Sequence, residues 1–408
     1  MLSKLSLLAA AVGLHMPLCT ANSRLRLGQQ PGLAASAYPA NLSIQVDPTP
    51  RAWPPLSPIA KRSNLNTNPD GSTFLWLPQD EYAGKTFFDR FQFFSDKDPT
   101  NGHVNYVDRS TAFAKQLVYV RDDGVVIMKG DDTTWLDKGV YRDSVRISSY
   151  AQYTTGLFIL DLNRAPWGCG TWPAFWTLGN GAWPTTGEID IIEGVHDNEH
   201  NQVAWHTRAG CTLTPEANFT GNIVQLNGQD NLDCNGLVNQ NSGCGIIEWS
   251  RASYGPYFDS IGGGVFAMKW DENGIAVWSF YRAAIPKDIL DGSPDPSQWG
   301  APSAALEPKN CDPLQFFANH SIVFDITFCG DWAGNSYATS GCPGTCEDRL
   351  TDPGNFVNAT WSINSLKVYR KQLIKGRITN DSAAVARNKF WTLYGCVLVI
   401  ITILSAWT

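Results

Sequence analysis

The chain has 408 residues, 43% of them hydrophobic and 17% charged, with a formal net charge of −7, and this length suffices for one large domain or two with a well-buried core. The acidic balance argues against a nucleic-acid partner, because nucleic acids are bound through basic surfaces. Sixteen Trp, 36 Gly and 24 Pro without a long amphipathic repeat indicate an all-β protein rich in loops.

The N-terminus carries the pattern of a secretory signal peptide, which we place at residues 1–21. Lys4 precedes an apolar run from Leu5 to Leu14, and small side chains near Ala21 suit a cleavage site. A membrane anchor is the alternative, but it would need a longer apolar run. The following residues 22–69 are rich in Pro, Ala and Ser, which predicts a flexible N-terminal arm.

Residues 70–370 have the pattern of one β-rich domain. Short runs rich in β-branched and aromatic residues alternate with turn signals, among them KQLVYVRDDGVVIMKGD, SVRISSY, GLFILDL and SIVFDITF. The runs FAMKW and IAVWSFY flank DENG, which predicts a β-hairpin. No long helix is expected between the two terminal segments. Many short strands at this spacing predict a β-sandwich or jelly roll whose long loops carry the function.

The C-terminus has two predicted parts, a polar stalk at residues 371–389 and a hydrophobic tail at residues 390–408. The stalk contains the small polar cluster Asn380 to Ala383, and the tail is predominantly apolar. Small residues, a short polar spacer and an apolar end form the pattern of a glycosylphosphatidylinositol (GPI) attachment signal. A retained membrane-spanning helix is the alternative, and the attachment residue stays open.

Cysteine usage agrees with export through an oxidising compartment. Apart from Cys19 in the signal peptide and Cys396 in the tail, eight cysteines remain, an even set that allows up to four disulfides whose pairing stays open. A zinc site is disfavoured, because only Cys342 and Cys346 lie close together and no His neighbours them. We therefore expect a protein secreted to the cell surface and GPI-anchored at the plasma membrane or cell wall. Five sequons permit N-glycosylation, at Asn41, Asn218, Asn319, Asn358 and Asn380.

The segment GEIDIIEG places three carboxylates within six residues of an apolar strand. In a regular strand Glu188 and Asp190 share a face, whereas Glu193 points the other way. A β-bulge at the Ile191–Ile192 doublet would return Glu193 to the face of Glu188. Two glutamates at that effective spacing of about four residues can bring their carboxyls to about 5 Å, the separation that retaining glycosidases use.

The clustering of these acids has three possible explanations. Burial and mutual repulsion raise carboxyl pKa values, and a glycosidase uses this to keep one acid protonated while another is ionised. Asp190 between the two glutamates would share a hydrogen bond and help to separate their pKa values. A solvated strand face is disfavoured by the Gly, Ile and Trp neighbours, and a calcium site would favour a flexible loop over a strand.

Tryptophans cluster just upstream of the acids, in GCGTWPAFWTLGNGAWPTTGEID. The ring faces of Trp172, Trp176 and Trp183 could pack against the apolar faces of sugar rings, as in a carbohydrate cleft. Packing within the core is the alternative, and it stays open for Trp172. Downstream, His206 in QVAWHTRAGC could hydrogen-bond a carboxylate or a substrate hydroxyl.

Together these motifs resemble the fungal laminarinase-type branch of glycoside hydrolase family 16, the endo-1,3(4)-β-glucanases. The resemblance covers about residues 70–370 and rests on GCGTWPAFWTLG, GEIDIIEG, WHT and FCGDWAGN. It implies a concanavalin-like β-jelly-roll sandwich with long loops forming a substrate cleft. It also implies Glu188 as nucleophile, Glu193 as acid/base and Asp190 as assisting carboxylate. The substrate-binding positions that it implies are Trp176, Trp183, His206 and, as a further sugar platform, Trp332.

Three functions stay open for such a chain. The leading hypothesis is a monomeric, retaining endo-β-glucanase that acts on 1,3- or mixed 1,3/1,4-β-glucan. The second is a cell-wall transglycosylase in which a sugar acceptor replaces water. The third is a non-catalytic β-glucan-binding protein, which the presence of both glutamates disfavours. The mechanism implies no cofactor and no catalytic metal, and a structural calcium ion, which the fold can hold, stays open.

Overall fold

Residues 66–374 are described by the structure, which is a computed structural model. They belong to one unit, Arg62–Thr408. The predicted signal peptide, residues 22–65 of the predicted arm, the stalk from residue 375 onward and the hydrophobic tail lie outside the described residues, so these assignments stay predictions. Within residues 66–374, no helix is both long enough and apolar enough to cross a membrane.

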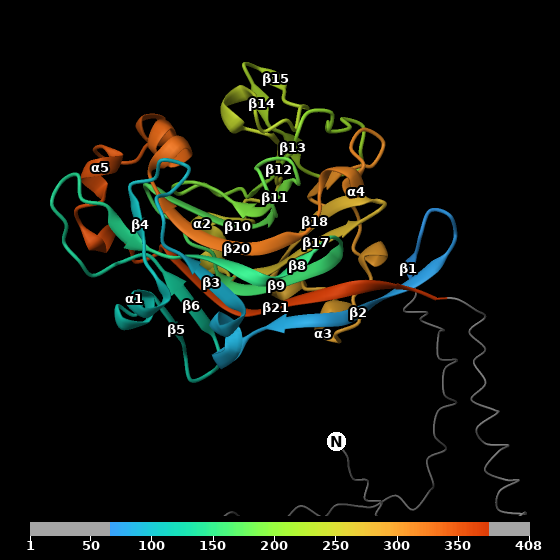
Figure 1. Ribbon diagram of the computed structural model, residues 1–408, viewed down its shortest axis with the longest axis horizontal. Coiled ribbons are helices and arrows are strands. Elements are labelled where there is room, and N and C mark those ends of the chain that lie inside the picture. The colour runs from blue at the N-terminus through green and yellow to red at the C-terminus, as the bar shows by residue number, and fades with distance from the viewer. Residues whose placement is uncertain (1–65, 375–408) are drawn as a thin grey trace, which may run out of the picture. The chain divides into compact units, whose positions relative to one another are not determined.

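Two large antiparallel sheets build the domain, and they confirm the all-β prediction (Figure 1). The nine-stranded sheet has the order β1 (Asn66–Thr67), β2 (Thr73–Tyr82), β21 (Thr360–Leu373), β9 (Gly156–Arg164), β17 (Gly264–Asp271), β18 (Gly274–Tyr281) and β19 (Ala304–Leu306), while β6 (Val126–Lys129) pairs with β21 and with β5 (Val118–Val120). The eight-stranded sheet has the order β13 (Asn222–Ile223), β16 (Cys244–Ile247), β12 (Gln202–His206), β11 (Glu188–Glu193), β10 (Thr171–Gly179), β20 (His320–Phe328), β8 (Arg146–Tyr153) and β3 (Phe91–Phe94).

Smaller elements connect these strands. Two short pairs stand apart from the sheets, β14 (Gln225–Leu226) with β15 (Gln229–Asp230) and β4 (Val104–Tyr106) with β7 (Arg142–Ser144). The α-helices are α1 (Arg109–Ala114), α2 (Gly255–Ser260), α3 (Lys287–Leu290), α4 (Pro313–Phe316) and α5 (Cys346–Arg349). Short helices of other types are η1 (Gly84–Arg90), η2 (Asn239–Asn241), η3 (Arg282–Ala284), η4 (Pro296–Gln298), η5 (Gly330–Gly334), η6 (Tyr337–Thr339) and η7 (Pro353–Phe356). As expected from the sequence, none of the described helices is long.

The main core lies between the two sheets. Phe324 of β20 stacks on Phe175 of β10 with ring centroids 4.6 Å apart, and it meets Trp361 of β21 edge-on at 5.5 Å. All three side chains are buried, and each contributes about 1.5–3 kcal/mol by leaving water. In Figure 1 the two sheets lie as stacked curved layers with the short helices at their margins. The other face of the eight-stranded sheet points away from this core and is available for a functional site.

The predicted hairpin and domain limits can be compared directly with the strands. β17 and β18 pair from Gly264↔Tyr281 to Asp271↔Gly274, which confirms the hairpin at DENG. The ordered strands extend past both predicted limits, because β1 begins at Asn66 and β21 continues to Leu373. Lys371, assigned to the stalk by composition, belongs to the sheet because it pairs with Trp76 of β2, and its side chain donates to Asp271 Oδ2 at 2.7 Å.

Four disulfides tie the loops to the sandwich. They use all eight cysteines of the predicted set, in the pairs Cys169–Cys342, Cys211–Cys311, Cys234–Cys244 and Cys329–Cys346. The close pair Cys342 and Cys346 thus joins two different distant cysteines. That arrangement leaves neither thiol for a metal site.

Candidate active site

Strand β11 carries the acidic segment, and its register contains the predicted bulge. On β12, Ala204 lies opposite Asp190 and Gln202 lies opposite Glu193, so that Ile191 and Ile192 together face one residue. Both isoleucines are fully buried in the core, and two successive inward side chains require this break in the alternation. The bulge predicted from the Ile-Ile doublet is therefore confirmed.

The consequence of the bulge is visible on the other neighbour, β10. Leu178 lies opposite Glu188 and Ala174 lies opposite Glu193, and these partners are four positions apart on a strand. Residues four apart on a strand share a face, so both glutamates point to the outer face of the sheet. Asp190 lies on the same face between them, opposite Trp176.

Glu188 has two polar neighbours. The indole N–H of Trp183 donates to its Oε2 at 2.9 Å, and Nε2 of His206 lies 3.8 Å from its Oε1. Burial and then the charge of Asp190 raise the pKa of Glu188 to about 7, against the opposing effects of His206 and Trp183. A carboxyl with this pKa is partly ionised at neutral pH.

Glu193 has a different donor. The indole N–H of Trp172 donates to its Oε1 at 2.9 Å. Burial, followed by the charge of Asp190, raises the pKa of Glu193 well above its usual range, whereas the Trp172 hydrogen bond lowers it. These surroundings therefore favour the protonated form of Glu193 in the free protein. Trp172 is half-buried and lies against an acid of the cluster, and a contact of its ring with a sugar stays a prediction.

His206 and Asp190 form an ion pair in the middle of the site, with His206 Nε2 3.2 Å from Asp190 Oδ2. Burial lowers the pKa of His206, but the Asp190 hydrogen bond and the charges of Glu188, Asp190 and Glu193 outweigh it and raise this pKa to about 9. Ligand atoms of Glu188, Asp190 and His206 also lie within 4.8 Å of one another, close enough for a metal ion. Metal binding needs a neutral imidazole, so a metal ion at this position would have to displace the proton of His206; with that proton present, the three side chains form an ion-pair network.

The predicted sugar-binding tryptophans lie in three different environments. Trp183 is 38% exposed beside the acids. Trp176 is on the same face but only 8% exposed, with its indole N–H donating to Asp325 Oδ2 at 3.0 Å and the Arg146 guanidinium 4.9 Å from its ring centre. Trp332 meets Trp172 edge-on with ring centroids 5.9 Å apart. The structure thus places Trp183 and Trp176 beside the acids and Trp332 against Trp172, and their sugar contacts stay predictions.

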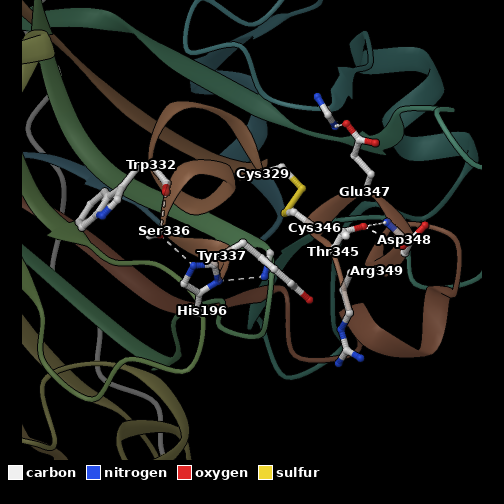
Figure 2. The surroundings of a disulfide bond; sticks show 12 residues. His196, Cys329, Trp332, Ser336, Tyr337, Thr345, Cys346, Glu347, Asp348 and Arg349 are labelled. Carbon is white, nitrogen blue, oxygen red and sulfur yellow. Dashed lines mark hydrogen bonds and ion pairs between the residues drawn. A yellow bond between two sulfur atoms is a disulfide. The ribbon is translucent and has the colours of Figure 1, made fainter. Parts of the chain in front are cut away.

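A hydrogen-bonded chain holds the turn that carries Trp332 (Figure 2). His196 Nδ1 accepts from the N–H of Gly170 at 3.1 Å, and burial lowers the pKa of His196, so its proton resides on Nε2. Nε2 then donates to Ser336 Oγ at 3.0 Å, and the Ser336 hydroxyl donates to the carbonyl of Trp332 at 2.7 Å. The Cys329–Cys346 disulfide closes the same turn.

One acid of the site, Asp325, was not among the residues predicted from the sequence. Asp325 lies on β20 opposite Ala174, in the same row as Glu193, and opposite Arg146 on β8. It is 6% exposed, and burial raises its pKa to about 7 although Arg146 opposes this shift. The signal was an acid within the apolar run SIVFDITF, since a charged residue on a buried strand requires a partner.

The chain matches one family model and several curated proteins. The family model described as "XgeA-like, catalytic GH16 domain" matches residues 91–369. A probable glycosidase of Schizosaccharomyces pombe is 45% identical over 293 residues, which cover 71% of this chain and 68% of that protein. An endo-1,3(4)-β-glucanase of Arthroderma benhamiae is 40% identical over 305 residues, which cover 72% of this chain and 65% of that protein. The chain therefore spans about two thirds of the length of these curated relatives.

Solved structures show the same fold. Laminarinase 16A of Phanerochaete chrysosporium, with the β-glucan 6-O-glucosyl-laminaritriose in its donor and acceptor sites, is 40% identical with a TM-score of 0.68 and covers 72% of this chain and 99% of its own. An elongating family 16 β-1,3-glucosyltransferase is 41% identical with a TM-score of 0.67 and covers 72% of this chain and 100% of its own. The jelly-roll fold expected from the sequence is thereby confirmed.

Proposed function

The chain belongs to glycoside hydrolase family 16, and from this premise we propose that it is a retaining endo-1,3(4)-β-glucanase, which hydrolyses 1,3- or mixed 1,3/1,4-β-glucan. The observation that carries the proposal is the bulged strand β11, which presents Glu188 and Glu193 on one face with separate indole donors. The endo-1,3(4)-β-glucanase of Arthroderma benhamiae and the laminarinase that binds a β-glucan support the choice of substrate.

The proposed reaction has two displacements. A carboxylate oxygen of Glu188 attacks the anomeric carbon while the proton of Glu193 passes to the departing glycosidic oxygen, so that the C–O bond breaks and a glycosyl–enzyme ester forms. Glu193, now ionised, takes a proton from water, whose oxygen attacks the same carbon and frees Glu188. The two inversions leave the product in the β configuration.

The neighbouring groups fit these roles. His206 carries a positive charge beside Asp190 and Glu188, which favours the ionised form that a nucleophile needs. Asp190 raises the pKa values of both glutamates through its charge, so it assists by keeping Glu193 protonated. The exposed ring of Trp183 next to Glu188 offers an apolar face for a sugar.

Transglycosylation is the second candidate function, and one comparison favours it. The elongating β-1,3-glucosyltransferase is as similar to this chain as the laminarinase is. Both reactions share the glycosyl–enzyme ester and differ in whether water or a sugar hydroxyl attacks it. The carboxylates of β11 serve either reaction, so the acceptor decides the outcome.

A product analysis tests the proposal. The protein and its Glu188→Gln variant are incubated with laminarin, lichenan, cellulose and agarose, and products are resolved by size. We expect new short oligosaccharides from laminarin or lichenan with the wild type only. Products longer than the substrate without new reducing ends would assign transglycosylation. Unchanged turnover by a folded Glu188→Gln variant, or glucan binding without products, would refute the proposal.

We also propose that the protein is a monomer exported to the cell surface and held there by a GPI anchor. The four disulfides support passage through an oxidising compartment, and the sequence patterns at both ends support secretion and anchoring. Release of the protein from intact cells by a phosphatidylinositol-specific phospholipase tests the anchor. Retention of all activity on treated cells would contradict it.

A further inference from the structure

The bulge of β11 interrupts the ladder of backbone hydrogen bonds. The side chain of Asn201 forms hydrogen bonds with the backbone groups on both sides of the bulge. The N–H of Glu193 donates to Oδ1 of Asn201 at 2.9 Å. Nδ2 of the same amide donates to the carbonyl oxygen of Ile191 at 2.8 Å. The side chain of Asn201 therefore spans Ile192, at the position where β11 and β12 differ by one residue.

Asparagine is the residue type that this position requires. Its amide offers an acceptor and two donors, and both kinds of atom are used. A carboxylate could not donate to the Ile191 carbonyl, and an apolar side chain would leave both backbone groups unpaired. Asn201 itself is fully buried, and its own N–H donates to Ser253 Oγ at 2.9 Å. The cost of leaving such buried groups unpaired is about 1–3 kcal/mol each.

A buried carboxyl group orients the amide. Oε1 of Glu248 accepts from Asn201 Nδ2 at 3.0 Å, and Oε2 accepts from the hydroxyl of Ser279. Glu248 is 1% exposed, directly follows β16, and does not take part in the proposed reaction. Ser279 belongs to β18 of the other sheet. The network thus connects the bulge to the opposite layer of the sandwich, which prevents the amide from turning.

We propose that Asn201, oriented by Glu248, is the positioning residue that fixes the bulge of β11 and so holds the carboxyl of Glu193 on the outer face of the sheet. Without the bulge, the alternation of a regular strand would turn Glu193 toward the core. Glu188 lies on the other side of the bulge, where Trp183 and His206 hold it. Loss of Asn201 therefore affects the acid/base more than the nucleophile. The inference rests on the proposed function.

Two substrates separate this role from a general loss of structure. Laminarin has a poor leaving group that Glu193 must protonate, whereas the dinitrophenolate of 2,4-dinitrophenyl β-laminaribioside leaves without a proton. The ratio kcat/KM reports only the steps up to the glycosyl–enzyme, so it excludes the later role of Glu193 as base. For full-length Asn201→Leu, kcat/KM should fall about 100-fold on laminarin and less than about fivefold on the aryl glycoside, since general acid catalysis contributes 10²–10⁴-fold.

The chain offers a matched control. Asn364 on β21 also uses its amide to bridge polar groups, donating to Asp161 Oδ1 at 2.8 Å and to Asn163 Oδ1 at 3.0 Å, and it belongs to the nine-stranded sheet. Asn364→Leu should lower the melting temperature while changing kcat/KM on the two substrates by equal factors. A selective loss on laminarin in this variant as well would overturn the inference.

Glu248 provides the second variant in case Asn201→Leu does not fold. Glu248→Ala removes the acceptor that orients the amide, and it should produce the same selective loss on laminarin to a smaller extent. Glu248→Gln keeps an oxygen that accepts from Asn201 Nδ2. Its kcat/KM values on laminarin and on the aryl glycoside should therefore have the same ratio as in the wild type. An equal fall in kcat/KM on both substrates in Asn201→Leu would overturn the inference. If Asn201→Leu does not fold, the same result in Glu248→Ala would overturn it. Wild-type inactivity on both substrates would refute the proposed function and this inference with it.

Discussion

The indole N–H of Trp183 donates to Oε2 of Glu188 over 2.9 Å, and this contact has a counterpart at the other end of β11. There the indole of Trp172 donates to Oε1 of Glu193 at the same distance. Each carboxyl thus has its own aromatic donor, and only Glu188 lies beside the cationic His206. This difference allows one acid to be ionised while the other stays protonated.

The first prediction concerns Trp183→Phe. The Trp183 hydrogen bond lowers the pKa of Glu188, so its loss raises that pKa and moves the acidic limb of the kcat/KM profile to higher pH. We expect a shift of about one unit, since a hydrogen bond to a charged group contributes about 1.5 kcal/mol. Trp299→Phe is the control, because Trp299 donates to Asp288 Oδ2 at 2.8 Å in the same way. An acidic limb that stays in place in Trp183→Phe would show that the contact does not tune Glu188.

The second prediction concerns Trp172→Phe. The Trp172 hydrogen bond lowers the pKa of Glu193, so removing it raises this pKa and extends the protonated form to higher pH. The basic limb of the kcat/KM profile, which reports loss of the acid, should move upward by about one unit. The acidic limb should stay where it is. A downward shift of the basic limb would contradict the assignment of Glu193 as the acid.

The third prediction concerns stability against pH. The folded pKa of His206 is about 9 and that of the unfolded chain is about 6.5, so between these values the folded protein binds a proton that the unfolded chain has released. The contribution of His206 to the free energy of unfolding is fully present below about pH 6.5 and is lost as the pH rises through 9. The free energy of unfolding should therefore fall, by at most about 1.4 kcal/mol per pH unit.

His206→Gln supplies the comparison for this measurement. Urea unfolding of both proteins at four pH values between 6.5 and 9.5 should show a steeper decline for the wild type, because the variant cannot bind the proton. Parallel declines would mean that other groups account for the pH dependence.

The fourth prediction concerns the disulfide that closes the turn of Trp332. Replacing Cys329 and Cys346 by Ser opens a loop with a sequence separation of 17, which should lower the free energy of unfolding by about 3 kcal/mol. Because Trp332 packs on Trp172, kcat/KM should also fall. The pair Cys211–Cys311 is the control that should lose stability and keep kcat/KM. Wild-type kcat/KM in the Cys329/Cys346 variant would show that the disulfide has no part in the site.

The register of β11 could be predicted from the sequence because it depends on neighbours along the chain. The period of two places Glu188 and Asp190 together, and the Ile191–Ile192 doublet requires the break that the strand contains. The hairpin of β17 and β18 is local in the same sense. Such features follow from residues a few positions apart.

The remaining parts of the site depend on contacts between distant segments. Eight cysteines allow 105 complete pairings, and sequence spacing does not choose among them. The burial of Trp176 depends on Asp325 and Arg146, which come from other strands. Asn201 could not be recognised as a site residue from the sequence, because its side chain binds two backbone groups of β11 and this contact depends on how the strands pair.

In the proposed mechanism, Glu188 forms the glycosyl–enzyme while Glu193 serves as acid/base. Mass spectrometry tests this after reaction of the protein with 2,4-dinitrophenyl 2-deoxy-2-fluoro-β-laminaribioside. The glycosyl–enzyme ester formed from this aryl glycoside is hydrolysed slowly. We expect a stoichiometric adduct on Glu188, absent in Glu188→Gln and present in Glu193→Gln. An adduct on Glu193, or rapid turnover of laminarin with the α anomer as first product, would contradict this mechanism.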